Sequence, residues 1–263
     1  MKIARFQPQS AFTMIEIAIS LAVIGFALVA IIGVLPTGMN VQRQNREETI
    51  INQDAAVFAS AIRQGARGLD DLTNYVYAIT NYWAVWDTNA PGTTTPPITS
   101  GLDGYVWTNS DVRSITPPPF LPLTNGFRIV GLMSRPKYDQ YQLPSDRFRS
   151  NHVVAFVHAL SGPASEKPPQ ANLEVKADAF SYRMICENLT IAADDGNTPH
   201  GHQLTNSFRE LRLTFRWPLS PTGVAGNGRQ TFRTQVGGHL LTTNDVGHVL
   251  YFFEPQTFAQ LPP

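Results

Sequence analysis

The densest apolar stretch of the chain lies close to its N-terminus, from Phe12 to Leu35. It reads FTMIEIAISLAVIGFALVAIIGVL, 24 residues in which Glu16 is the only ionisable side chain. A helix of this length measures about 36 Å, more than the roughly 30 Å of a bilayer's hydrocarbon core. The pattern therefore predicts a membrane-spanning helix over residues 12–35. A cleaved secretory signal is the alternative, but its apolar part is usually about 7 to 15 residues long and ends in small residues, unlike residues 36–39 here.

A second helical pattern follows a polar stretch, in residues 36–66. Four apolar residues spaced by four, three and four share one helix face: Ile51, Ala55, Phe58 and Ile62. We expect this face to pack on a soluble domain, with a helix stop near Arg67 beside Gly65 and Gly68. Gly33 and Pro36 predict either a bend in the helix or its end, because proline lacks a backbone donor and clashes one turn back.

Residues 69–150 have no clear period. An aromatic group precedes a Thr-, Pro- and Gly-rich tract from Thr88 to Gly104, and three prolines follow at 117–119. We expect loops with short strands or helices here. The aromatic group consists of Tyr75, Tyr77, Tyr82, Trp83 and Trp86. It is expected to fill core space, with a carbohydrate-stacking surface as the alternative.

Strand patterns are clearest in the C-terminal half. They cover His152–Leu160, Ala179–Leu189, Leu211–Trp217, Gln230–Val236 and Val249–Phe253. Apolar and polar residues alternate from Leu211 to Trp217, as in a half-buried strand, and a turn-rich stretch from Pro218 to Gly228 suggests an antiparallel pair with the next strand. The order of elements predicts an α+β fold, a long N-terminal helix followed by a globular head over residues 67–263 that contains an antiparallel sheet.

Composition adds little to this picture. The 263 residues carry 20 Lys and Arg against 20 Asp and Glu, so no overall field favours nucleic acid. Arg212, Arg216 and Arg233 form the one patch of interest for nucleic acid, but the polar face has no interleaved aromatics, which favours a solvated or subunit-facing sheet. The single cysteine, Cys186, rules out an internal disulfide.

Motifs for catalysis are missing from the sequence. It has no P-loop, G-x-G-x-x-G, G-x-S-x-G or H-E-x-x-H, and Cys186 lies in an apolar strand pattern that favours a buried thiol. His200 and His202 with His239 or His248 could be drawn as a metal site, but chance accounts for such groupings. The turn at residues 194–197 lacks the spacing of a calcium loop. We expect no catalytic site, metal or cofactor, and hence a protein that is not an enzyme.

Glu16 is the anomaly of the apolar segment. An acidic residue at the centre of a membrane helix costs about 3 kcal/mol, and Glu16 lies one turn inside the run. A carboxylate that reaches back to the membrane surface is one explanation. The other is a functional carboxylate that awaits a cationic partner on another subunit.

The stretch Ser10, Ala11, Phe12, Thr13, Met14, Ile15, Glu16 resembles the N-terminal signal of type IV prepilins and type II secretion pseudopilins. In that family a short basic leader ends at a small residue before F-T-L-I-E, and Lys2 and Arg5 supply the basic residues here. Ala11 stands where the family usually has Gly, and Met14 where it has Leu. The resemblance extends to about residue 65.

The resemblance implies that residues 1–11 are a leader, which prepilin peptidase removes between Ala11 and Phe12 before it methylates the new amine of Phe12. Glu16 then becomes the fifth residue of the mature chain and serves in assembly. The implied partners are prepilin peptidase, other pilin or pseudopilin subunits and an inner-membrane assembly platform. The size of the head favours a minor subunit.

The sequence thus predicts a structural subunit of a type IV pilus or type II secretion filament, held in the bacterial inner membrane by a single span. Lys2 and Arg5 place the N-terminus in the cytoplasm and the head in the periplasm, although Arg43 and Arg46 follow the span. Two alternatives remain. One is a periplasmic domain that binds carbohydrate or another ligand and has a pilin-like anchor, and the other is an anchored hydrolase.

Overall fold

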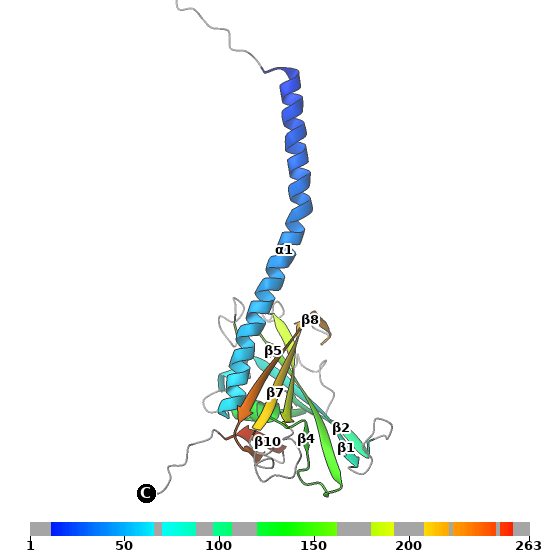
Figure 1. Cartoon of the computed structure of the whole chain (residues 1–263), viewed down its shortest axis with the longest axis vertical. Helices are drawn as coiled ribbons and strands as arrows, with labels where there is room; N and C mark the ends of the chain where they lie inside the picture. The colour runs from blue at the N-terminus through cyan, green and yellow to red at the C-terminus, as the bar shows by residue number, and fades with distance from the viewer. Residues whose placement is uncertain are drawn as a thin grey trace, which may run out of the picture. The chain divides into compact units, whose positions relative to one another are not determined.

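The computed structural model describes residues 12–65, 70–87, 97–106, 120–161, 180–191, 208–220, 223–245 and 248–254. The chain forms two compact units, Met1–Thr49 and Ile50–Pro263, and each is described by itself. The described part consists of a long N-terminal helix and a globular part built on a mixed sheet (Figure 1). This is the predicted α+β layout, in which helix and sheet are segregated along the chain.

Helix α1 runs from Met14 to Gln64 and includes both predicted helical segments. Pro36 lies inside it, which excludes the helix end, one of the two alternatives predicted at this residue. The end comes at Gly65, whose φ of 68° only glycine adopts without strain. Arg67 and Gly68, also expected near the end, lie outside the described residues.

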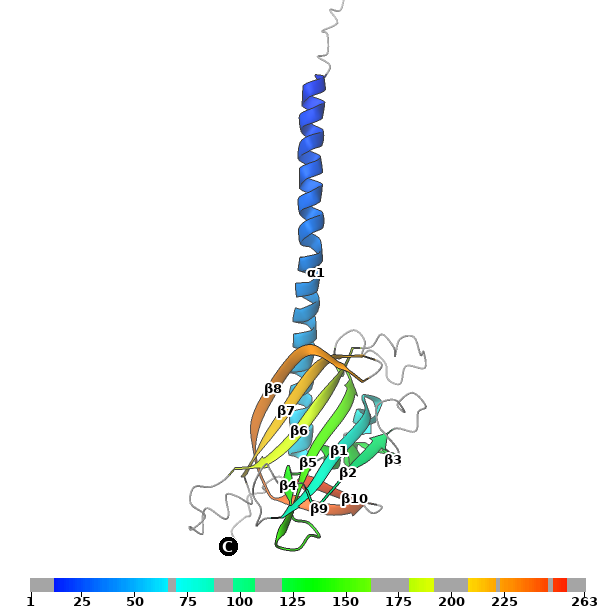
Figure 2. The same cartoon turned by 90° about the vertical axis from the view of Figure 1, so that its right-hand side faces the viewer.

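The large sheet has the strand order β3-β2-β1-β5-β6-β7-β8. Its strands are β1 (Val76–Asp87), β2 (Thr99–Val106), β3 (Phe120–Pro122), β5 (Arg147–His158), β6 (Ser181–Thr190), β7 (Phe208–Leu219) and β8 (Ala225–Gly237). Figure 2 shows them side by side, with the last part of α1, from Ile50 onward, behind the sheet. All pairs on this path are antiparallel except β2 with β3, which is parallel, so the sheet is mixed.

Each predicted strand of the C-terminal half has a counterpart in the structure. The β7–β8 pair is antiparallel as expected, but both strands extend into the stretch from Pro218 to Gly228 that was predicted as a turn. The stretch from residue 99 to 104, where loops with short strands or helices were expected, belongs to strand β2. Strand β1 was not predicted, although it is 12 residues long.

Strand β4 (Tyr138–Asp139) is a short insertion within the large sheet. Strand β6 pairs with β5 only over residues 153–158 of β5. The earlier part of β5 pairs with β4 instead, through Arg149 and Ser150. On its other side the same segment contacts β6 by a bridge between Pro136 and Asn188. The segment thus fills the gap between two diverging strands and satisfies their backbone groups.

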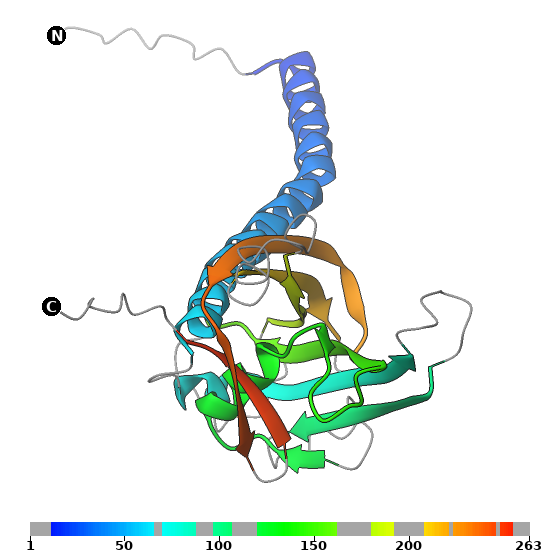
Figure 3. The ribbon, with the colours of Figure 1, turned by 60° about the horizontal axis from the view of Figure 1, so that its bottom comes forward.

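The remaining elements pack on one face of the sheet. They are the 3-10 helix η1 (Asp70–Asn74), helix α2 (Gly126–Met133) and a hairpin of β9 (Leu240–Asp245) with β10 (His248–Phe253), which Figure 3 shows in dark red and red. Buried Arg128 fixes α2 to β9, since its Nε and Nη2 donate to Asp245 at 2.9 and 2.7 Å. A Cβ on Gly131 would lie 2.8 Å from Leu250, so α2 can approach β10 this closely only with glycine there.

The main core lies between this face, called the inner face, and the helices. Ile51, Phe58 and Ile62 of α1 are fully buried against it, as the spacing predicted. The inner face supplies Val153, Ala155, Tyr182, Met184, Cys186, Leu211, Leu213 and Phe215. Strand residues between these point to the opposite, outer face. Cys186 is buried as predicted, and burial raises the pKa of its thiol, which keeps it protonated.

Asp54 is a carboxylate buried on the apolar side of α1, with no exposed surface. It accepts hydrogen bonds from the backbone N–H groups of Leu160 and Ser161, the Ser161 hydroxyl and the Tyr182 hydroxyl at 2.6–3.0 Å. Burial raises its pKa, while these four donors oppose that shift. Asp54 therefore ties the helix to the end of β5 and to β6.

The aromatic group of β1 divides between the two faces. Tyr82 is exposed on the outer face. Its ring is tilted by 49° against that of His152, and the ring centroids are 6.3 Å apart. Trp83 and Trp86 are half-buried, and their indole N–H groups donate to Asp103 and Ser150. None of the five is fully buried: Tyr75 and Tyr77 pack half-buried against core clusters, so the expectation that the group fills core space is confirmed only in part.

Candidate assembly segment

The first turn of α1 forms a capping box. Thr13, immediately before the helix, accepts a hydrogen bond from the backbone N–H of Glu16 at 3.4 Å. In return the Glu16 carboxylate accepts from the backbone N–H of Thr13 at 2.9 Å and from its hydroxyl at 2.8 Å. Thr-x-x-Glu at a helix start is a common way to satisfy N–H groups that have no partner inside the helix. The structure therefore gives Glu16 a local role that the sequence analysis did not consider.

The helix that follows Glu16 is apolar on all sides and exposed. Every residue from 12 to 46 is exposed in the structure, including Phe12 at 81%. A window of 18 residues in α1 reaches a mean hydropathy of 2.8. By length and composition the helix can cross a membrane, and a signal sequence near the N-terminus would pass the same test. An apolar surface of this extent is expected to be covered by lipid or by another protein.

Of the predicted site residues, the structure describes Phe12 and Glu16, and Ala11 lies outside the described residues. Phe12 and Glu16 are four positions apart at the start of the helix, about one turn. Among the described residues, no cation lies within ion-pair distance of the Glu16 carboxylate. The side chain is thus capped by neutral donors and its charge has no counter-ion in the described part of the chain.

The other candidate sites from the sequence either lack support in the structure or lie outside the described residues. His200, His202 and the turn at 194–197 are outside the described residues. In the part of the chain that the structure describes, no group of three His, Cys, Asp or Glu side chains could hold a metal ion.

The arginine patch has a different composition from the one predicted. Arg212 lies 3.0 Å from Glu210 and 3.8 Å from Glu187, and Arg233 lies 3.9 Å from Glu210. These ion pairs neutralise most of the local charge. Arg216 instead belongs to a second set on the outer face.

That set, the arginine row, contains Arg183, Arg216 and Arg229, directly opposite one another on β6, β7 and β8. Within the described ranges none of the three has an ion pair, and the buried Nε atoms of Arg183 and Arg216 have no hydrogen-bond acceptor. Arg183 could not be assigned to this set from the sequence, because cross-strand register is not visible in one sequence.

Comparisons with known proteins give no further assignment. No family model, curated protein or solved structure matches the chain. Conclusions about function therefore depend on the residues of this chain and on the resemblance of its first turn to the prepilin signal.

Proposed function

We propose that the protein is a structural subunit of a membrane-associated filament, of the type IV pilin and type II secretion pseudopilin class. The single observation that carries this proposal is the position of Glu16, a lone carboxylate at the start of an exposed apolar helix. It lies five residues into the chain that remains after cleavage between Ala11 and Phe12. Prepilin peptidase, other subunits and an inner-membrane assembly platform are the partners that follow from this class. The head would lie in the periplasm.

The proposed role of Glu16 is to pair with the Phe12 amine of a neighbouring subunit. Two opposite charges about 4 Å apart attract by about 4 kcal/mol at an effective dielectric of 20. This is comparable to the cost of about 3 kcal/mol for an acidic residue in a membrane helix. The pair would offset that cost only in the assembled state, and a subunit staggered by one turn would leave both charges unpaired. Glu16 would then set the register of assembly.

The capping box provides a competing explanation for Glu16. A carboxylate at this position stabilises the first turn through the Thr13 N–H whether or not another subunit is present. Charge and capping can be separated, because glutamine also closes a capping box but carries no charge. Glu16→Gln is therefore the informative variant. Glu16→Ala removes both the charge and the cap, and Glu16→Asp keeps the charge.

We expect Glu16→Gln and Glu16→Ala to insert into the membrane as well as the wild type, or better, and both to be incorporated poorly into the filament. Glu16→Asp should be intermediate, since it keeps the charge on a shorter side chain. The measurement is the amount of each variant that co-purifies with its assembly, relative to the total in the membrane. N-terminal sequencing of the same preparations should find a methylated Phe12.

The outcomes separate the two roles. Normal incorporation of Glu16→Gln with poor incorporation of Glu16→Ala would assign Glu16 to helix capping and remove charge pairing. Normal incorporation of Glu16→Ala would remove both. An intact Met1 in the membrane-bound protein would contradict the proposed class itself, whatever the variants do.

A further inference from the structure

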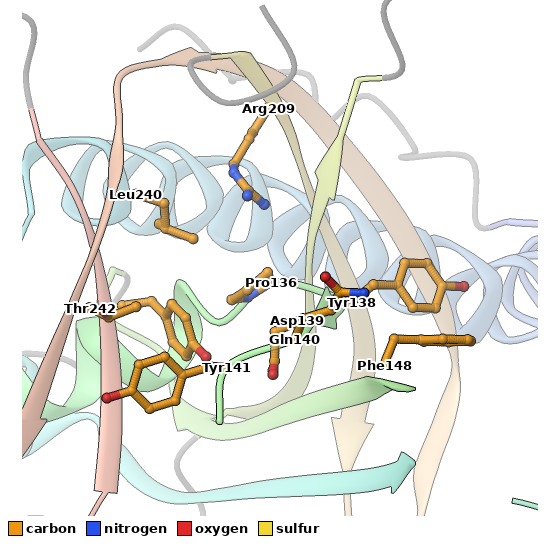
Figure 4. A pocket seen from close by; sticks show the side chains of 10 residues that line it. Pro136, Tyr138, Asp139, Gln140, Tyr141, Phe148, Arg209, Leu240 and Thr242 are labelled. Carbon is orange, nitrogen blue, oxygen red and sulfur yellow. The ribbon is translucent and has the colours of Figure 1, made fainter. Parts of the chain in front are cut away.

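A wide, open pocket of about 810 Å³, called the cavity below, lies in the unit formed by residues 50–263. Its lining comes from three distant parts of the chain: the segment 136–148 around β4, Arg209 at the start of β7, and the β9–β10 hairpin (Figure 4). Pockets that hold small molecules usually measure about 300–1,000 Å³. The cavity therefore has the size of a binding site for a small molecule.

Aromatic side chains form much of the wall of this cavity. They are Tyr138, Tyr141, Phe148 and Tyr251, and the ring of Tyr138 meets that of Phe148 edge-on at 5.9 Å. Burial raises the pKa of Tyr251 to about 12, so its hydroxyl stays protonated. Flat aromatic walls with hydroxyl groups favour a ring-shaped ligand that has both apolar and polar faces.

Arg209 brings a positive charge into the cavity. Its side chain points inward in Figure 4, and its backbone is held between Thr190 of β6 and Val236 of β8. Its Nε and Nη1 atoms are buried and have no hydrogen-bond acceptor among the described residues. Burial lowers the pKa of this guanidinium, as expected where no carboxylate compensates the charge.

Asp139 supplies an acceptor to the same cavity. Its Oδ2 accepts a hydrogen bond from the Asn151 amide at 2.6 Å, which fixes the carboxylate. Its Oδ1 is buried and has no donor within the described part of the chain. The wall thus carries unsatisfied donors on Arg209 and an unsatisfied acceptor on Asp139. A buried polar group without a partner is unfavourable, and more so when it is charged.

We infer that this cavity is a binding site for a small ring-shaped carboxylate that also carries hydroxyl groups. The ligand's carboxylate would accept from Arg209, a ligand hydroxyl would donate to Asp139 Oδ1, and the ring would lie on the aromatic wall. Uronic acids and hydroxybenzoates both have this chemistry. The inference goes beyond the proposed function and does not depend on it.

A neutral or cationic ligand fits the cavity less well. A cation would meet Arg209, whose charge has no ion pair among the described residues. A neutral sugar would satisfy Asp139 but would leave the guanidinium buried without a counter-charge. A hydroxylated carboxylate satisfies both groups, because its carboxylate accepts from Arg209 in a charge-assisted hydrogen bond and its hydroxyl donates to Asp139 Oδ1.

The test is calorimetric titration of the full-length protein in detergent micelles. The probes are D-galacturonate and 4-hydroxybenzoate, with neutral D-galactose as the matched control for the carboxylate. We expect at least one carboxylate to bind at least tenfold more tightly than galactose. Arg209→Gln should weaken that binding about tenfold or more, which corresponds to the loss of one charged hydrogen bond. Asp139→Asn should weaken it less.

Arg216→Gln is the control variant, because it removes the same charge from the outer face of the same strand and should bind normally. A second readout covers misfolding: Arg209→Gln should unfold at the same temperature as the wild type or higher without ligand, since it removes an unpaired buried charge. Added carboxylate should raise the unfolding temperature of the wild type and of Arg216→Gln, but not that of Arg209→Gln. Unchanged binding in Arg209→Gln, equal loss in Arg216→Gln, or no binding of either carboxylate at about 10 mM would overturn the inference.

Discussion

Asp54 shows how one polar residue can fix the position of a helix. The α1 face it shares with Ile51 and Phe58 is otherwise apolar, so a carboxylate there must be satisfied within the fold. Four donors from the end of β5 and from β6 do so. The sequence held a signal for this role: Asp54 lies three residues after Ile51 and four before Phe58, on the predicted buried face.

Replacing Asp54 should therefore be severe. We expect Asp54→Ala to lower the free energy of unfolding by about 3 kcal/mol or more, because two backbone N–H groups and two hydroxyls lose their acceptor. Tyr182→Phe removes one donor and should cost about 1 kcal/mol. Denaturant unfolding of the full chain in micelles, followed by tryptophan fluorescence, measures both.

The neighbouring position provides the matched control for this series. Gln53 is exposed on the same turn of α1, and Gln53→Ala should change stability by less than about 0.5 kcal/mol. If Asp54→Ala were as mild as Gln53→Ala, the four hydrogen bonds would contribute nothing net to the fold.

At the scale of elements, the outer face of β6, β7 and β8 carries two kinds of arginine. Arg212 is neutralised by Glu210 and Glu187, whereas the arginine row brings three like charges together across neighbouring strands. Like charges directly opposite in a sheet are destabilising. Arg212 and Arg216, four residues apart on the outer face of β7, should therefore have opposite effects on the stability of the fold.

We expect Arg216→Thr to raise the free energy of unfolding by about 0.5 kcal/mol and Arg212→Thr to lower it by a similar amount. Threonine suits both positions because it favours strands and already lies between them at Thr214. Both differences should shrink as salt is raised from about 0.01 to 1 M, because both side chains are partly exposed and salt screens their charges. A loss of stability in Arg216→Thr that salt does not alter would show that the row is compensated.

Much of this fold could be predicted from the sequence, in particular where one period dominates. The buried face of α1 and the alternation from Leu211 to Trp217 were confirmed because each follows a regular spacing. Strand β1 escaped prediction because its buried positions include Thr80 and Asn81, which break the apolar pattern. The Asn81 amide N–H donates to Asn151 Oδ1 at 3.1 Å, a partner 70 residues away that no local pattern reveals.

The candidate sites also differ in whether a local sequence pattern reveals them. Glu16 could be found because its anomaly is local, a charge in an apolar run. The cavity could not, since Asp139, Arg209 and Tyr251 come together only through the order of the strands. The arginine row likewise depends on register, which fixes the opposition of Arg183, Arg216 and Arg229.

At the scale of the whole molecule, the boundary between the two compact units falls within α1, between Thr49 and Ile50. The helix thus belongs to both units, and its last part is a core element of the second. Ile51, Phe58 and Ile62 are fully buried there. Any shortened protein that is to fold must retain this part of the helix.

We expect a protein that begins at Asn40 to be soluble and monomeric or weakly associating, because it lacks the apolar run but keeps the buried helix face. A protein that begins at Gly65 should aggregate, since the inner face of the sheet would be uncovered. Sedimentation and circular dichroism distinguish the two. Equal behaviour of both proteins would contradict the assigned role of residues 50–64.

The short insertion of β4 has a consequence for how this protein could misassemble. Most sheets expose free backbone groups only at their outermost strands, and proteins protect those edges against pairing with other chains. Here the ends of β5 and β6 are held by the segment 136–139, through N–H groups of Lys137 and Asn151 that donate at 2.8 Å. Withdrawal of that segment would open two new edges in the middle of the sheet. In addition to its outer edges at β3 and β8, this sheet therefore has a point open to intermolecular strand pairing between two of its central strands.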